Sequence, residues 1–283
     1  MAVKIITDSL SDIHGDLAKS LDVEVVPVYV RFGDKVYKDR IEITTDEFYR
    51  RLVNDPNWPS TTQPTPNDFL EAYKRAARET NEILVVTLSS KLSGTYESAQ
   101  AAKRMMDNNK VRIEVIDSQT VVMGLGTMVA AACKMANKGA SLDELISRVK
   151  KDIDRSHAVM YLDTLKYLAK GGRIGKAQGL VGSLLSVKPI LTIKEGEVAP
   201  MTRVRSRQTG IDYLYNFAAG FKKIEELAVE HATTPGDADA LINRLSAVFP
   251  KERIIKSTVS PVIGTYTGPL VIAVCLLGDK DSS

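Results

Sequence analysis

The stretch Ile83-Leu84-Val85-Val86-Thr87-Leu88, with Ser89-Ser90-Lys91-Leu92-Ser93-Gly94-Thr95-Tyr96 directly after it, joins a short apolar run to a cluster of hydroxyl side chains. A near-continuous apolar run is typical of a strand buried on both faces of a parallel sheet. Thr95 to Met106 carries an Ala-rich face at helical spacing and predicts a helix. The hydroxyls therefore lie where a strand passes into a helix N-terminus, whose unpaired N–H groups favour an anion.

A second hydroxyl-rich segment, Ser60-Thr61-Thr62-Gln63-Pro64-Thr65-Pro66, precedes another predicted helix. Thr65 offers a hydroxyl at the N-cap, Pro66 stands at the first helical position and Asp68 supplies an acid at the third. This combination indicates a helix start. Two such loops on one sheet can converge on one negatively charged group.

The first half of the chain alternates predicted strands and helices. Strands are expected at 3–7, 23–32, 83–88 and 111–116, and helices at 12–20, at 45–53 with Thr45 as N-cap, from Thr65 onward, at 95–106 and at 123–137. Asp117-Ser118 ends the last of these strands, and such carboxyl-end loops face ligand sites in open α/β sheets. The alternation predicts a parallel-sheet α/β domain over residues 1–157.

The second half has a different pattern. Strands are expected at 158–162, 226–231, 253–259 and 270–276, helices at 164–170, 206–223 and 237–249, and a hairpin at 189–204. Gly171-Gly172 ends the first helix, and Glu195-Gly196 forms the hairpin turn. We therefore predict an α+β domain over residues 158–283, so that the fold class is α/β with two domains.

Composition excludes several function classes. The chain has 283 residues, 44% hydrophobic and 26% charged, as in ordinary globular proteins. A net charge of +3 is too weak to argue for nucleic acid. No apolar run is long enough to span a membrane, and the N-terminus fits a first strand better than a signal peptide. Cys133 and Cys275 lack metal-ligand or redox spacing. We expect a cytoplasmic protein without a metal site.

Five short motifs are jointly specific. They are Thr7-Asp8-Ser9-x-Ser11-Asp12, Thr61-Thr62-Gln63-Pro64-Thr65-Pro66-x-x-Phe69, Leu88-Ser89-Ser90-x-Leu92-Ser93-Gly94-Thr95-Tyr96, Ile116-Asp117-Ser118 and Lys170-Gly171-Gly172-Arg173-Ile174. Their order and spacing resemble the DegV family along essentially the whole chain. The resemblance implies a bacterial two-domain protein that binds a long-chain fatty acid such as palmitate. It also implies a partner, a fatty acid kinase that phosphorylates the bound carboxylate.

The family's carboxylate contacts fall on Thr61 and Ser93 in this sequence. Thr62 is adjacent and could share the role of Thr61, and Gly94 and Thr95 are expected near the ligand. The resemblance also places Tyr266, in Gly264-Thr265-Tyr266-Thr267-Gly268-Pro269, where the family commonly carries a histidine near the head group. Tyrosine donates a hydrogen bond but supplies no imidazolium, so any role that needs one is in doubt.

A smaller departure concerns the first hydroxyl loop, where the family usually has Thr-Ser-Gln-Pro-Ser-Pro. Here it is Thr61-Thr62-Gln63-Pro64-Thr65-Pro66, which keeps the hydroxyls. Asp8, Ser9, Asp117 and Ser118 are expected to cap helices and brace the loops near the site rather than to bind metal.

Two further sets of residues are candidates beside the head group. Arg173 and Arg205, together with Arg203 and Arg207, could form a basic rim that docks an acidic partner or meets a phosphate. The acyl chain is expected among apolar residues of the second domain, namely Leu162, Leu165, Leu168, Leu184, Leu185, Ile190 and Leu191.

Other interpretations remain open. Ser93 and Thr61 could simply cap helices. Ser93 could be the nucleophile of an acyl hydrolase or transferase, although Leu92-Ser93-Gly94 lacks the first glycine of G-x-S-x-G and none of the three histidines shows a triad pattern. A lipid-sensing module is a third possibility. The favoured hypothesis is a non-enzymatic carrier without cofactor, in lipid transport or fatty acid metabolism, that presents the fatty acid to a separate kinase.

Overall fold

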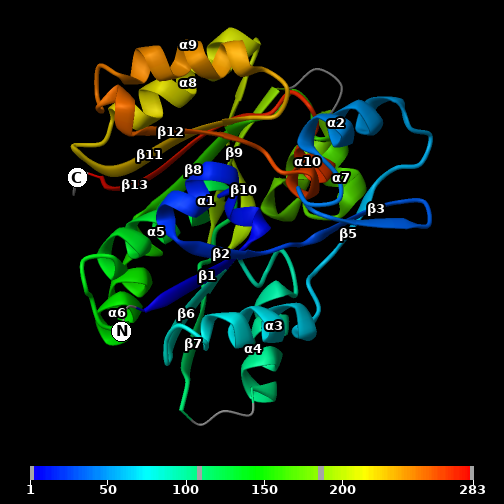
Figure 1. Cartoon of the computed structure of the whole chain (residues 1–283). Helices are drawn as coiled ribbons and strands as arrows, with labels where there is room; N and C mark the ends of the chain where they lie inside the picture. The colour runs from blue at the N-terminus through cyan, green and yellow to red at the C-terminus, as the bar shows by residue number, and fades with distance from the viewer. Residues whose placement is uncertain (1–2, 107–109, 184–187, 281–283) are drawn as a thin grey trace.

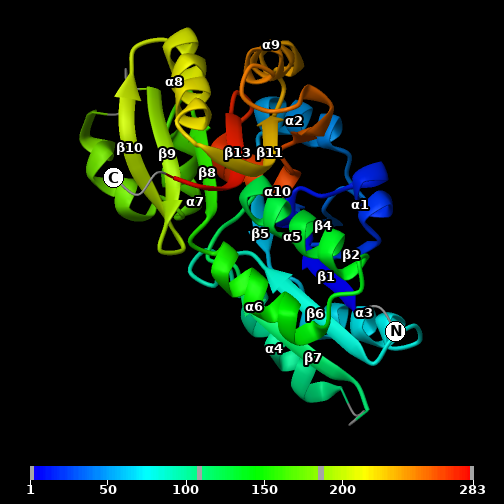
Figure 2. The ribbon, with the colours of Figure 1, turned by 90° about the vertical axis from the view of Figure 1, so that its left-hand side faces the viewer.

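The computed structural model describes residues 3–106, 110–183 and 188–280, and arranges them in five layers (Figure 1). Two helices form one outer layer, a parallel sheet the second, a buried helix the third, a mixed sheet the fourth, and two more helices the fifth. Figure 2, turned by 90°, shows the same order. Both sheets are covered on both faces, which explains their near-continuous apolar strands.

The N-terminal sheet consists of four parallel strands. Its order is β2 (Val23–Val26), β1 (Lys4–Asp8), β6 (Glu82–Thr87) and β7 (Arg112–Asp117). In β6, Ile83 and Val85 pack toward α3 (Pro66–Ala76) and α4 (Thr95–Met105), whereas Leu84 and Val86 face the layer between the sheets. The alternating side chains of one strand thus fill two separate cores.

The C-terminal sheet is mixed and has six strands. Its order is β10 (Glu197–Val204), β9 (Lys188–Lys194), β8 (Ser156–Tyr161), β13 (Ile272–Asp279), β11 (Lys223–His231) and β12 (Ile254–Thr258). Only the β11–β12 pair is parallel within this sheet. Its outer face is covered by α8 (Arg207–Ala219) and α9 (Pro235–Leu245).

Helix α5 (Met123–Ala136) lies between the two sheets and is buried almost all round. Small residues let it approach its neighbours closely. A Cβ at Gly126 would lie 2.4 Å from the Ser11 carbonyl oxygen, and one at Gly124 would lie 3.1 Å from the Ala158 Cβ. The two halves therefore share one continuous core, and α6 (Leu142–Asp152) extends it.

A third, three-stranded sheet and several short elements lie beside the layers, at the right of Figure 1. The strands are β4 (Lys35–Lys38), β3 (Tyr29–Phe32) and β5 (Ser60–Thr62), and the neighbouring helices are α2 (Thr45–Asn54), α7 (Lys166–Gly171) and α10 (Pro261–Thr267). The remaining elements are η1 (Ser9–Ser11), α1 (Gly15–Leu21), η2 (Gly175–Ser183) and η3 (Lys251–Arg253). Helix α10 packs against α2, α7, β3 and β5 and so joins the two ends of the chain.

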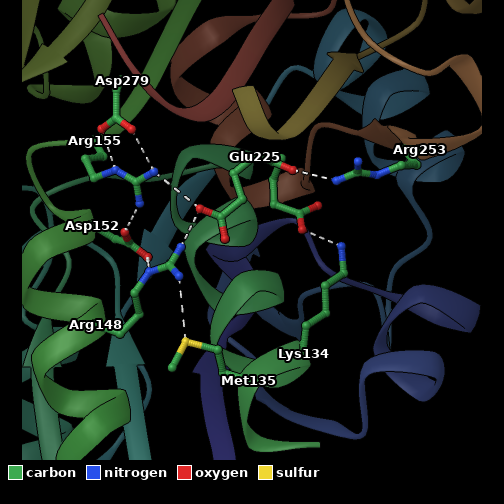
Figure 3. A network of polar contacts seen from close by, with 9 residues as sticks. Lys134, Met135, Arg148, Asp152, Arg155, Glu225, Arg253 and Asp279 are labelled. Carbon is green, nitrogen blue, oxygen red and sulfur yellow. Dashed lines mark hydrogen bonds and ion pairs between the residues drawn. The ribbon is translucent and has the colours of Figure 1, made fainter. Parts of the chain in front are cut away.

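A polar network ties α6 to the C-terminal sheet (Figure 3). Arg148 donates to Asp152 at 2.7 Å and to Glu225 at 2.6 Å. Arg155 donates to Asp152 at 2.5 Å and to Asp279 at 2.7 Å. Asp152 is fully buried, and its two oxygens are each paired with a guanidinium, so its charge is neutralised at the junction.

The predicted fold class is confirmed, with a parallel-sheet α/β half followed by an α+β half. Some local predictions are wrong. Thr44, not Thr45, caps α2, because its hydroxyl accepts the Glu47 N–H. The helix predicted at 12–20 begins only at Gly15, since η1 and the left-handed Asp12 precede it. The extended segment 23–32 is two strands in different sheets.

Two segments for which no strand or helix was predicted prove to be regular elements. Thr61 and Thr62 belong to strand β5, and Tyr266 belongs to helix α10. The boundary near residue 157 stays a prediction, because the core between the sheets runs through both halves. Within the described residues, no helix is both long and apolar enough to cross a bilayer.

Candidate functional site

A cavity of about 180 Å³ lies between the two halves of the molecule. Six apolar side chains from the first half line it: Leu10, Val28, Leu88, Leu92, Val121 and Val122. Six more come from the second half: Met160, Leu168, Ile193, Val198, Val262 and Ile263. The polar lining residues are Thr61, Thr62, Gln63, Ser93, Arg173, Tyr266 and Thr267. An apolar cavity with a few polar groups suits an amphipathic ligand.

Thr61 and Tyr266 meet at the polar end of the cavity. Their hydroxyls share a hydrogen bond, although 205 residues separate them in the chain. Thr61 is held by β5, which pairs with β3 at Val30, and Tyr266 by α10. Residues from the two halves of the chain thus form one pair of neutral hydrogen-bonding groups.

Ser93 reaches the cavity from the loop that leads into α4. Its hydroxyl shares a 2.9 Å hydrogen bond with that of Thr95. Gly94 is the N-cap of α4 and provides no side-chain cap, so the first N–H groups of this eleven-residue helix lack a side-chain cap. The loop is braced by Asp117, which accepts the Ser90 hydroxyl at 2.5 Å.

Arg173 lines the cavity just after α7. Its guanidinium lies 5.3 Å from the centre of the Tyr266 ring and donates to the Gly171 carbonyl oxygen at 2.9 Å. Gly171 must lack a side chain, because a Cβ there would lie 2.3 Å from the Tyr266 ring. Tyr266 thus contacts both Thr61 and the segment that carries Arg173.

A polar hollow of about 370 Å³, here called the outer hollow, adjoins the polar end of the cavity, which we call the head-group end after the ligand expected there. It shares Leu92, Ser93, Arg173 and Val198 with the cavity, and its other lining residues are Ser90, Lys91, Gly94, Gly172, Gly175 and Glu197. Two cations and one carboxylate face it, so this side of the site favours an anion.

The other end of α10 lies against a buried group that we call the acid cluster: Asp8, Asp12, Asp39, Arg40 and Glu230. Arg40 donates to Asp12 at 2.8 Å. Burial raises the pKa of Asp8 to about 7, although hydrogen bonds from backbone N–H groups oppose it. Burial also raises the pKa of Asp39 to about 7, with Arg40 opposing it. The pKa values of Asp12 and Glu230 are raised by burial as well.

The structure brings most of the predicted site residues together. Thr61, Thr62, Ser93, Arg173 and Tyr266 line the cavity. Gly94 lines the outer hollow instead. Thr95 lies buried behind Ser93.

Other predicted residues lie elsewhere. Arg205 is not among the residues that line the cavity or the outer hollow. Arg207 binds Asp237, Thr234 and the Leu270 carbonyl oxygen, so its guanidinium is already paired within the fold.

Only part of the predicted chain-binding set lines the cavity. Leu168 lines the cavity, but Leu162, Leu165, Ile190 and Leu191 are core residues that do not line it. Leu184 and Leu185 lie outside the described residues. Half of the apolar lining comes from the first half of the chain, whereas the prediction placed the acyl chain in the second half alone.

Several lining residues were missed. Gln63 stands inside a recognised motif, and its position beside Thr61 and Thr62 was a usable signal. Val122 could not be found, because an apolar residue in a cavity looks like any core residue in a sequence. Its backbone is nevertheless unusual for a β-branched residue, with φ 55° and ψ −153° at the N-cap of α5.

The geometry around Ser93 bears on the nucleophile interpretation. Its hydroxyl pairs with Thr95 rather than with a histidine. His14 is at the N-cap of α1, His157 packs against Phe217 and Phe221, and His231 ends β11. In the described part of the chain, no group of three or more His, Cys, Asp or Glu could hold a metal ion.

Comparison with known proteins adds an independent line of evidence. The family model described as uncharacterised protein, DegV family, matches residues 2–279. A DegV domain-containing protein of Caldanaerobacter subterraneus subsp. tengcongensis is 38% identical over 94% of this chain and 95% of its own length. A DegV domain-containing protein of Clostridium perfringens is 36% identical over 95% of this chain and 96% of its own.

Solved structures agree with this relationship. The DegV family protein from Thermus thermophilus, described in terms of fatty acid binding, has a TM-score of 0.89 at 32% identity and covers 99% of this chain and 100% of its own. DegV from Bacillus subtilis, described as a fatty acid binding protein, has a TM-score of 0.89 at 28% identity with the same coverage.

Proposed function

Because this chain belongs to the DegV family, we propose that it binds a long-chain fatty acid in the cavity between its two halves. The carboxylate contacts Thr61 and Ser93, and the acyl chain lies among the apolar lining residues. The protein carries the fatty acid in the cytoplasm without a cofactor and without transforming it. The observation that carries this proposal is an apolar cavity whose polar groups gather around Thr61, Ser93 and Tyr266.

The apolar lining supplies the affinity. An acyl chain of about fifteen methylenes gains on the order of 12 kcal/mol on leaving water, at about 0.8 kcal/mol per CH₂. Immobilising the ligand costs several kcal/mol of this gain. The remainder is compatible with submicromolar binding and with co-purification of a fatty acid from the host.

The head-group contacts supply orientation at low cost. Hydroxyls of Thr61, Ser93 and Tyr266 can donate to a carboxylate, and the N-terminus of α4 adds unpaired N–H groups. None of these groups needs a buried cation. The ligand's charge can therefore enter and leave without stranding an unpaired charge of the protein.

A carrier must also expose the carboxylate to whatever uses it. The outer hollow reaches Ser93 from outside, and Lys91 and Arg173 line it. We propose that a separate ATP-using kinase phosphorylates the bound carboxylate through this hollow, where the two cations would balance the added charge. The kinase is the most specific part of the proposal.

The first test is native mass spectrometry of freshly purified protein, with organic extraction and identification of any bound lipid. We expect one long-chain fatty acid per chain. The double variant Thr61→Ala, Ser93→Ala should lose it. A matched control, Ser20→Ala with Ser246→Ala, removes exposed hydroxyls that bind only backbone carbonyls and line neither the cavity nor the outer hollow, and should keep the lipid.

Protein at its bare mass that also fails to take up added palmitate or oleate would overturn the proposal. Stoichiometric labelling of Ser93 by a serine-directed fluorophosphonate would instead favour the hydrolase. For the kinase, acyl phosphate should form from ATP only when protein, fatty acid and kinase are all present.

A further inference from the structure

The Gln63 side chain lies at the head-group end of the cavity, and its amide occupies the space that a side chain at Gly94 would need. Gln63 follows Thr61 and Thr62 and lines the cavity beside them. Its amide lies directly over the loop that carries Ser93. A Cβ placed on Gly94 would lie 2.5 Å from Gln63 Nε2 and 2.7 Å from its Oε1. The absence of a side chain at position 94 is what lets the amide come this close to Gly94, the residue after Ser93.

The amide is not used by the fold. No hydrogen bond of the Gln63 side chain occurs among the described residues. The adjacent helix start does not need it, because Thr65 and Asp68 already satisfy each other in a capping box. A polar group that lines an apolar cavity without an internal partner is available to a ligand.

The chemistry of the amide matches a carboxylate. Its NH₂ group is a donor that stays neutral, like the hydroxyls of Thr61 and Ser93. Thr61 and Gln63 come from β5 and the residue after it, Ser93 comes from the loop before α4, and the two segments meet at the contact between Gln63 and Gly94. Together they offer donors to both oxygens of one carboxylate.

We propose that Gln63 is a third ligand of the fatty acid head group, donating its amide N–H to the carboxylate from the space left open at Gly94. It makes the site selective for acids over alcohols of the same chain length. This inference rests on the proposed function and adds to it the residue that sets head-group selectivity.

The test compares dissociation constants for oleic acid and oleyl alcohol, measured by competition against a bound fluorescent alkyl probe. Gln63→Glu keeps the size of the side chain but replaces a donor with a negative charge. We expect its affinity for oleic acid to fall about 10- to 100-fold, the range for losing a hydrogen bond to a charged group. Affinity for oleyl alcohol should change by less than about threefold, since no charge is present to repel.

Two further variants isolate the contact. Gln63→Met has a side chain of similar length but no donor. Its affinity for oleic acid should be about tenfold lower than that of the wild type at every pH between 6 and 8. Gly94→Ala should push the amide away and give a similar loss. If both act through one contact, the double variant should be no worse than either alone. Gln63 is exposed, so melting temperatures should stay close to that of the wild type.

Each outcome is decisive. If wild-type protein binds neither ligand, the proposed function itself fails. If it binds oleic acid and Gln63→Met binds it equally well, Gln63 is not a ligand. Equal losses for acid and alcohol in Gln63→Glu would show a packing role and overturn the inference. Loss confined to the acid supports it.

Discussion

The two ends of helix α10 handle negative charge in opposite ways. At its start, the Ser260 N–H donates to Asp12 at 3.0 Å, inside the acid cluster around Arg40. Near its end, Tyr266 meets Thr61 through neutral hydroxyls at the edge of the cavity. The first end holds ionisable groups that belong permanently to the protein. The second is suited to a charge that comes and goes.

The two ends of α10 also differ in how their polar groups are paired. The acid cluster places four buried carboxyl groups around one guanidinium, and Asp12 and Glu230 share a hydrogen bond within it. Such a cluster is stable only with its cation in place and with raised carboxyl pKa values. The head-group end offers donors that need no counter-charge when empty. In the function proposed here, one short helix thus carries a permanent anchor at its start and an exchangeable site near its end.

The largest expected effect is on the anchor. Arg40→Met should lower the free energy of unfolding by about 3–5 kcal/mol, because it leaves the fully buried Asp12 without a cation. Denaturant titration measures this. Lys256→Met is the matched control, since it breaks an exposed pair with Asp239 and should cost less than about 1 kcal/mol. Equal losses in both variants would show that the acid cluster is no anchor.

The pH dependence of stability should be next in size. Asp39 has a raised pKa of about 7 in the folded state against a reference of 3.8, so the folded protein retains a proton that the unfolded chain releases between these values. Its contribution to stability is complete below about pH 4 and is lost as the pH rises through 7, by up to about 1.4 kcal/mol per pH unit. Asp8 acts in the same direction.

Asp39→Asn isolates this effect from the other titrating groups. The asparagine oxygen can still accept the Ser9 hydroxyl, which Asp39 now holds at 2.7 Å. We expect stability to fall less steeply in the variant than in the wild type between pH 4 and 7. Parallel curves would contradict the raised pKa of Asp39.

The sequence predicted the residues around the head-group end of α10 more easily than those of the acid cluster at its start. β6 and α4 were predictable because local pattern and tertiary position agree. Asp8 was expected to brace loops, and it does accept the Leu88 N–H at 2.8 Å. Arg40 and Glu230 gave no signal, since they are 28 and 218 positions from Asp12 along the chain.

Helix α10 itself was missed for a physical reason. Residues 261–267 include a glycine and β-branched residues, with no polar face that would mark a helix. The helix exists because it is packed on all sides. A Cβ at Gly264 would lie 2.6 Å from the Tyr49 hydroxyl. Tertiary packing, rather than local sequence, determines that this segment is helical. Tertiary packing also determines which apolar residues line the cavity.

At the exchangeable end, Tyr266→Phe should weaken fatty acid binding by about 5- to 10-fold, the cost of one ordinary hydrogen bond. Stability should change by less than about 1 kcal/mol, because the ring remains in place. Calorimetric titration with oleic acid measures the affinity. Tyr213→Phe, on α8 away from the cavity, is the matched control and should bind as the wild type does. Wild-type affinity in Tyr266→Phe would remove Tyr266 from the site.

The smallest expected effect comes from making the exchangeable end titratable. The residues that line the cavity in the described structure include no histidine and no carboxyl group, so we expect wild-type affinity to vary less than about twofold between pH 6 and 8. Tyr266→His adds an imidazole that can become a charged donor to the carboxylate as the pH falls.

The neighbouring Arg173 limits that gain. Its guanidinium lies 5.3 Å from the centre of the Tyr266 ring, whose place the imidazole of Tyr266→His would take. The positive charge of Arg173 disfavours protonation of that imidazole. We therefore expect affinity at pH 6 to exceed that at pH 8 by only about threefold in Tyr266→His, well below the full effect of a free histidine. The double variant Tyr266→His, Arg173→Gln should enlarge this ratio. A ratio unchanged by Arg173→Gln would mean that the guanidinium does not act on the head-group end, and that its place is in the outer hollow alone.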